Sequence, residues 1–252
     1  MAFIDVHAHL DFFDEKNIDE AVKRARKAGL GVIVNSGITA ERIKKTLELT
    51  AKYPDIVRAC LGLYPVDMLE MSEKEIEGQI KIIRKAAKEG KVVGVGEIGM
   101  DLKMAGEVDR QKKNFERMIS LALELDLPIV IHSRKAELEC TEILEKMNAK
   151  RVSMHCFSGK FSLIKRGVEN GWCYSVPANV TFSEHFQKMA KEIPLSNLLC
   201  ETDTPYLHPI KGQMDNEPAN VVESYKKIAE IKGISLKECE KAIEDNYKRL
   251  FG

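Results

Sequence analysis

Short apolar runs alternate with longer amphipathic segments along the whole chain. Several runs are continuous rather than alternating, for example Val32-Ile33-Val34 and Ile129-Val130-Ile131. Continuous apolar strands are typical of a parallel sheet that is covered on both faces. The runs predict strands at residues 3–8, 31–36, 57–63, 92–97, 129–133, 152–157, 172–176 and 198–202.

The segments between these runs carry apolar residues at helical spacing. Ser72 and Glu75 have the spacing of a capping box, and Gly29, Gly90 and Gly171 stand where helices are expected to end. The predicted helices cover residues 17–28, 39–52, 72–89, 109–126, 135–147, 161–170, 183–192, 217–232 and 235–249.

Eight strand–helix units in 252 residues have the dimension of a (β/α)₈ TIM barrel. A doubly wound open sheet is the alternative, but it usually has a glycine-rich phosphate loop after its first strand. Here the first strand ends in His7-Ala8-His9-Leu10-Asp11 instead. No linker or low-complexity stretch divides the chain, so we expect an α/β barrel of a single domain over residues 1–252.

The charges balance, with 39 basic and 39 acidic residues. This argues against a strongly basic footprint for nucleic acid, although a local groove of lysines would not change the total. No apolar run approaches the roughly 18 to 20 residues that span a bilayer. The first residues lack the pattern of a signal peptide. We therefore expect a cytoplasmic protein without a membrane or an obligatory protein partner.

The six cysteines form no C-x-x-C pair. Cys60, Cys156, Cys173 and Cys200 fall inside predicted strands, where a free thiol behaves as a small apolar residue. We expect them to be buried and reduced, as in a cytosolic protein.

His7 and His9 are two residues apart at the end of the first predicted strand, so their imidazoles project from one face. Active sites of barrels gather at the carboxyl ends of the strands. Other polar residues stand at equivalent ends, and nitrogen and oxygen ligands of this kind suit one or two divalent ions such as zinc, manganese or magnesium. The candidate metal ligands are His7, His9, Glu97, His132, His155 and Asp203.

Each of these residues has a plainer interpretation. His132 or His155 alone could be a buried histidine that is hydrogen-bonded to its neighbours. A carboxylate such as Glu97 or Asp203 after an apolar strand is costly to bury unless it is paired or bound to a metal. One shared site explains all six residues better than separate coincidences, and it predicts a metal-dependent hydrolase. The other histidines, at positions 185 and 208, lie in a predicted helix and a loop and are expected to be ordinary polar residues.

Six segments in order along the chain resemble the TatD-type metal-dependent hydrolases, a deoxyribonuclease-like branch of the amidohydrolase superfamily. The resemblance covers essentially the whole chain. The segments are Asp5-x-His7-x-His9-Leu10-Asp11, Gly96-Glu97-Ile98-Gly99-Met100-Asp101, Pro128-Ile129-Val130-Ile131-His132-Ser133-Arg134, His155-Cys156-Phe157-Ser158-Gly159, Glu201-Thr202-Asp203-Thr204-Pro205-Tyr206-Leu207 and Asn216-Glu217-Pro218.

The resemblance implies two adjacent divalent ions, either Zn²⁺, Mg²⁺ or Mn²⁺. His7, His9 and Asp203 would serve the first ion, His132 and His155 would serve the second, and Glu97 would bridge them. Such a pair generates a metal-bound hydroxide at neutral pH and clamps the oxygens of a phosphodiester.

Asp203 is the candidate general base in this scheme, and Glu97 is the second carboxylate expected to take part in catalysis. Arg134 is the cation expected to hold the charge that develops on phosphorus, because its planar fork suits a phosphate. Its alternative role is a salt bridge that braces the rim of the barrel. Lysines 103, 160 and 211 lie in predicted loops on the same side and could line a groove for nucleic acid, although loop lysines are usually only solvated.

Three segments depart from the family pattern. The family commonly has Gly-x-His-Pro-His after the third strand, whereas Tyr64 and Val66 stand in the histidine positions here. In the loop before Asn216, Lys211 replaces an arginine and Asp215 is acidic. The segment Asp101-Leu102-Lys103 lacks the usual aromatic pair. None of these changes touches the six candidate ligands, so they put the substrate in doubt rather than the chemistry.

The leading hypothesis is a two-metal phosphodiesterase, namely a deoxyribonuclease that acts on DNA ends or single strands. DNA or another phosphodiester would then be the partner. The same scaffold could instead hydrolyse a carboxylic or aminoacyl ester, a lactone or a C–N bond. A barrel that binds metal or nucleic acid without catalysis is the third possibility, and it would predict a broken ligand set, which the sequence does not have.

Overall fold

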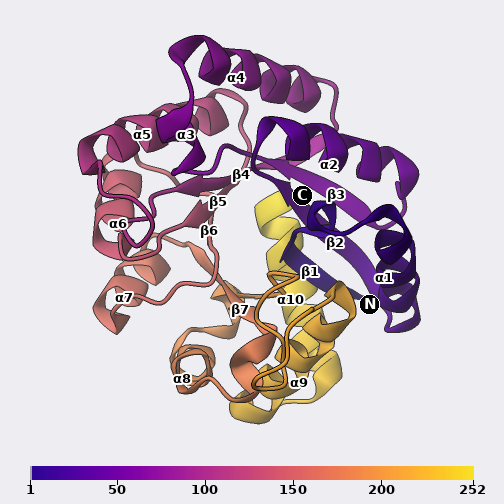
Figure 1. The fold of residues 1–252 in the computed structure, drawn as a ribbon. Coiled ribbons are helices and arrows are strands. Elements are labelled where there is room, and N and C mark those ends of the chain that lie inside the picture. Colours follow the sequence, from indigo (N-terminus) through magenta and orange to yellow (C-terminus); the bar gives the residue numbers. More distant parts are fainter. Residues whose placement is uncertain (1) are drawn as a thin grey trace.

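Eight parallel strands follow one another in chain order around a barrel in the computed structural model, which describes residues 2–252 (Figure 1). The strands of this barrel are continuously apolar because both of their faces are buried, one in the barrel interior and one under the outer helices. Ile129, Val130 and Ile131 of β5, for example, have at most 1% of their surface exposed. The strands are β1 (Phe3–Ala8), β2 (Leu30–Gly37), β3 (Val57–Leu61), β4 (Val92–Gly99), β5 (Ile129–His132), β6 (Val152–Met154), β7 (Cys173–Pro177) and β8 (Leu198–Glu201).

Helices connect the strands and form the outer layer of the barrel (Figure 1). The α-helices are α1 (Glu15–Lys27), α2 (Ala40–Lys52), α3 (Asp67–Glu70), α4 (Glu73–Lys88), α5 (Val108–Glu124), α6 (Glu137–Lys146), α7 (Phe161–Glu169), α8 (Glu184–Glu192), α9 (Val221–Lys232) and α10 (Leu236–Phe251). Short 3-10 turns are η1 (Leu10–Phe12), η2 (Ala178–Thr181), η3 (Leu195–Asn197) and η4 (Pro218–Asn220). No helix of residues 2–252 is long and apolar enough to cross a membrane.

The first and last strands meet along a seam that closes the barrel. The backbone N–H of Asp203 donates to the carbonyl of His7 at 3.0 Å, and the N–H of His9 donates to the carbonyl of Thr204 at 3.0 Å. The buried carboxylate of Asp5 adds side-chain hydrogen bonds across the same seam. It accepts the N–H of Thr202 at 3.0 Å and its hydroxyl at 2.5 Å. The predicted (β/α)₈ barrel is therefore confirmed.

Most predicted elements are confirmed with small shifts at their ends. Ser72 and Glu75 form the expected capping box at α4. Gly29, Gly90 and Gly171 follow helices with φ of 91°, 69° and 82°, which a glycine adopts without strain.

Two predicted ends are wrong. The strand expected over 152–157 ends at Met154, because the chain turns at Cys156, whose φ is 42°. Cys156 is consequently outside the sheet and only partly buried, unlike the buried Cys60, Cys173 and Cys200. The helix expected from residue 217 begins at Val221, after the 3-10 turn that Pro218 opens. The short helix α3 and the 3-10 turns were not predicted.

Candidate metal centre

The carboxyl ends of the strands surround a cavity of about 650 Å³. All six candidate ligands lie at this end of the barrel, and five of them line the cavity, with His7 buried directly behind it. The lining residues are His9, Phe12, Ile38, Tyr64, Glu97, His132, Ser133, Arg134, His155, Cys156, Ser158, Phe186, Asp203, Tyr206 and Leu207. A hollow of the same volume lies between α2 and α4 on the outside of the barrel and holds none of the six.

The two histidines of β1 lie side by side, as their spacing predicts. Their Nε2 atoms are 3.1 Å apart. Ser36 of β2 orients both rings: its carbonyl lies 3.0 Å from Nδ1 of His9, and its hydroxyl lies 3.1 Å from Nδ1 of His7. Because a carbonyl only accepts, Nδ1 of His9 carries the proton, and Nε2 of a neutral ring keeps its lone pair for an ion.

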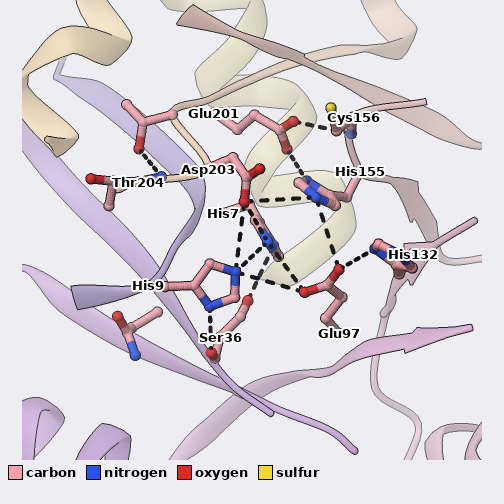
Figure 2. A network of polar contacts seen from close by, with 12 residues as sticks. His7, His9, Ser36, Glu97, His132, His155, Cys156, Glu201, Asp203 and Thr204 are labelled. Carbon is pink, nitrogen blue, oxygen red and sulfur yellow. Dashed lines mark hydrogen bonds and ion pairs between the residues drawn. The ribbon is translucent and has the colours of Figure 1, made fainter. Parts of the chain in front are cut away.

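Two carboxylates complete this group (Figure 2). Oε2 of Glu97 lies 3.7 Å from Nε2 of both His7 and His9, and Oδ1 of Asp203 lies 3.6 Å from the same two nitrogens. A tetrahedral ion with ligand distances of about 2.0–2.2 Å holds its ligand atoms about 3.3–3.6 Å apart. His7, His9 and Asp203 therefore have the spacing of ligands that share one divalent ion, and Glu97 lies beside the same two histidines.

The second half of the cluster faces the other oxygen of Glu97. Oε1 lies 3.9 Å from Nε2 of His155 and 2.6 Å from Nδ1 of His132. The first distance suits a shared ion, whereas the second is a direct hydrogen bond and is too short for two ligands of one ion. Glu97 thus divides its oxygens between the two halves, as a bridge would. A second ion between His132 and His155 requires the contact of His132 with Glu97 to open.

Outer hydrogen bonds fix the two histidines of the second half. Nδ1 of His155 donates to Glu201 at 2.8 Å, which turns Nε2 toward the cluster. Glu201 also accepts the N–H of Cys156 at 3.0 Å and the hydroxyl of Ser175 at 2.5 Å. Nε2 of His132 lies 3.0 Å from Oδ2 of Asp101. Outer partners of this kind set the orientation and basicity of metal-binding imidazoles.

The outer roles of Glu201 and Asp101 were not predicted from the sequence. Glu201 stands two residues before Asp203, and Asp101 follows Glu97 in one motif, so both carboxylates were visible only as parts of motifs. The costly burial of a carboxylate after an apolar strand is the signal that could have found Glu201.

The buried groups shift one another's protonation. Burial lowers the pKa of His7, and the neighbouring imidazoles of His155 and His9 lower it further, so His7 is neutral. Burial raises the pKa of Asp203 to about 6 against the opposing effect of the imidazoles. Burial would also raise the pKa of Glu97, but the charge and hydrogen bond of His132 outweigh it and hold this pKa well below its usual range.

In the second half of the cluster, the two histidines are the groups that carry protons. Burial lowers the pKa of an imidazole, but Glu97 and Asp101 outweigh this effect and raise the pKa of His132 to about 9. In the same way Glu201, Asp203 and Glu97 raise the pKa of His155 to about 10. Without an ion, the positive imidazoles therefore offset part of the negative charge of the surrounding carboxylates.

Arg134 lines the cavity and is exposed. Within residues 2–252 its guanidinium has no hydrogen bond or ion pair, so the salt bridge weighed as its alternative role is not observed. Lysines 103, 160 and 211 are exposed and lie outside the lining, so the expected groove of lysines stays a prediction. His185 and His208 also lie outside the lining; Nε2 of His185 contacts the carbonyl of Phe157 at 3.0 Å.

The two residues that replace the family's histidines differ in position. Tyr64 lines the cavity, and its hydroxyl donates to Asp101 at 2.7 Å. Val66 lies outside the lining, directly before helix α3. Only the first of these departures therefore touches the candidate metal centre.

Comparisons with known proteins identify relatives over the whole chain. The family model "TatD related DNase" matches residues 4–252. The deoxyribonuclease TATDN3 of Homo sapiens is 31% identical over 263 residues, which cover 100% of this chain and 95% of that protein. An uncharacterized metal-dependent hydrolase of Methanocaldococcus jannaschii is 36% identical, covering 99% and 96%. The crystal structure of a TatD homologue from Escherichia coli K12 superposes with a TM-score of 0.88 at 29% identity, covering 99% and 97%.

Proposed function

The chain belongs to the TatD-related DNase family of metal-dependent hydrolases, and from this premise we propose that it is a deoxyribonuclease that uses two divalent ions. The observation that carries the proposal is the cluster in which Nε2 of His7, Nε2 of His9 and Oδ1 of Asp203 lie close enough to share one divalent ion, with Glu97 beside the same two histidines. His132 and His155, on the other side of Glu97, would hold the second ion.

Ions bound here would lower the pKa of a water molecule and neutralise charge on a phosphodiester. The protein's own side chains would position the substrate and accept the proton of the attacking water. Asp203 is the proposed general base because 15% of its side chain is exposed toward the cavity, against 4% for Glu97. Oδ1 of Asp203 faces the histidines, which leaves its second oxygen for a proton.

Arg134 is the proposed phosphate ligand. Its guanidinium stands in the cavity without a protein partner among residues 2–252, so its donors are available to a phosphate. Planar guanidinium groups bind phosphate oxygens in pairs and hold the charge that develops during displacement.

The test is cleavage of an end-labelled DNA oligonucleotide by metal-stripped protein reloaded with Mg²⁺, Mn²⁺ or Zn²⁺. We expect metal-dependent cleavage that falls by at least about a hundred-fold in Asp203→Asn. Asp215→Asn is the matched control, because Asp215 is an exposed carboxylate in the loop that follows Asp203. Intact DNA with metal demonstrably bound would overturn the proposal.

A carboxylic ester or lactone is the second candidate substrate class. The observation that favours it is the apolar part of the cavity lining, which includes Phe12, Ile38 and Leu207. Turnover of an aryl carboxylic ester without turnover of an aryl phosphodiester would support this alternative.

A further inference from the structure

The cavity has two unlike sides. The strands follow one another in order around the barrel, so β1 and β8 are neighbours and β5 lies across the barrel from β1 (Figure 1). Polar groups follow β5 and β6, namely Ser133, Arg134 and Ser158. Aromatic and apolar groups follow β1 and β8, namely Phe12, Tyr206 and Leu207.

Two aromatic side chains, Phe12 and Tyr206, lie directly beside the candidate metal centre. Phe12 lies three residues after His9, and their ring centroids are 5.1 Å apart. Tyr206 lies three residues after Asp203, and its N–H donates to the carbonyl of Asp203 at 2.8 Å. The centroids of Phe12 and Tyr206 are 6.2 Å apart at 73°. These rings are therefore within reach of a group next to a substrate bond that sits at the ligands.

Phe12 is held in place from behind. The guanidinium of Arg42 lies 3.5 Å from the centroid of its ring. Asp11, which is buried, fixes this guanidinium by accepting from it at its carbonyl (3.0 Å) and its carboxylate (3.1 Å). Phe12 lines the cavity and Arg42 does not, so Arg42 supports the ring from outside the cavity lining. The ring is positioned before any ligand arrives, which reduces the entropy lost on binding.

Tyr206 is the exposed member of the pair. It shows 48% of its surface to solvent at the edge of the cavity. An aromatic ring left half in water beside an active site is a surface for a flat ligand. Nucleobases stack on aromatic side chains irrespective of sequence.

The charge of the cavity limits the length and the pairing of that ligand. Among the described residues that line it, Arg134 is the single arginine or lysine. One cation serves one phosphate, whereas binding along a duplex needs several phosphate contacts. The cavity thus offers one phosphate position opposite one aromatic surface.

We propose that Phe12 and Tyr206 form a binding subsite for an unpaired nucleobase of the nucleotide next to the scissile phosphate. The subsite requires this base to be unpaired, because a paired base has no free face for the two rings. This inference rests on the proposed nuclease function and adds the group that the site recognises.

The first experiment compares cleavage of a single-stranded oligonucleotide with that of the same strand carrying an abasic tetrahydrofuran residue at one end, tested at each end in turn. We expect the wild type to cleave the base-containing end roughly ten-fold faster. Phe12→Leu and Tyr206→Leu should cleave it at the abasic rate, and Tyr206→Phe should keep the preference. Phe182→Leu is the matched control, since Phe182 is 41% exposed but lies outside the cavity lining.

The second experiment reads stacking without cleavage. The fluorescence of 2-aminopurine deoxynucleoside monophosphate is quenched when its base stacks, so the wild type should quench it and the two leucine variants should not. Cleavage with neither quenching nor a preference for the base overturns the subsite and leaves the nuclease proposal standing. Quenching without cleavage of any strand supports the subsite and overturns the nuclease proposal. Absence of both overturns both.

Discussion

The hydroxyl of Tyr64 donates a 2.7 Å hydrogen bond to Oδ2 of Asp101, the oxygen that also lies 3.0 Å from Nε2 of His132. The other nitrogen of His132 contacts Glu97. A continuous path of contacts therefore joins a tyrosine on the cavity wall to the carboxylate that divides the candidate metal centre. The resemblance to the family predicts a histidine at position 64, so this path includes a residue that departs from the expected pattern.

Replacing Tyr64 by phenylalanine removes the hydroxyl and keeps the ring. Asp101 loses one donor, and the orientation and basicity of His132 change with it. We expect a roughly ten-fold loss of affinity for the second ion and of kcat/KM. Titration of the metal-stripped protein with Zn²⁺ measures the first quantity. Tyr247→Phe is the control, since Tyr247 lies on helix α10 away from the site; an equal loss in both variants would contradict the path.

Replacing Glu201 by glutamine should affect both metal binding and stability. The carboxylate accepts from His155, Cys156 and Ser175, and an amide cannot accept at both of its atoms. We expect metal affinity to fall 10- to 100-fold and the free energy of unfolding to fall by about 1–3 kcal/mol. Urea denaturation measures the second effect. The exposed Glu142 supplies the control Glu142→Gln, which should change neither quantity.

Metal uptake should release protons. At pH 7 His132, with a pKa of about 9, and His155, with a pKa of about 10, are protonated in the metal-free protein. An ion needs the lone pair of each ligating nitrogen, so these protons must leave. The affinity therefore rises with pH, by up to about ten-fold per unit for each proton released, and levels off above the raised pKa values.

Calorimetric titrations in two buffers with different heats of protonation measure the protons released. His132→Ala should release fewer of them, and His185→Ala should match the wild type. Equal heats in both buffers would show that the imidazoles are already neutral before the ion binds.

The parts of the site that could be predicted depend on residues that are close together along the chain. His7 and His9 are two residues apart on one strand, so the periodicity of a strand places them together. The fold class follows from apolar runs such as that of β5, which is buried on both faces.

The parts that could not be predicted depend on contacts between distant segments. Cys156 and Phe157 follow His155 and resemble a continued strand, yet the chain leaves the sheet after Met154. Cys156 takes a positive φ, and its N–H donates to Glu201. The partner of Tyr64 is 37 residues away along the chain. Neither contact leaves a periodic pattern, because long-range packing decides both.

The seam between β1 and β8 gives the last prediction. Asp5 is fully buried and accepts from the N–H and hydroxyl of Thr202 and from the N–H of His7 at 3.3 Å. Alanine at this position leaves these donors without a partner, and a buried donor of this kind costs about 1–3 kcal/mol. We expect Asp5→Ala to lower the free energy of unfolding by about 3 kcal/mol or more in urea denaturation. Thr202→Val removes only the hydroxyl and should cost less. Because His7 and Asp203 also meet at this seam, the loss of stability should be accompanied by weaker metal binding. A stable Asp5→Ala variant with unchanged metal affinity would show that the backbone hydrogen bonds alone close the barrel.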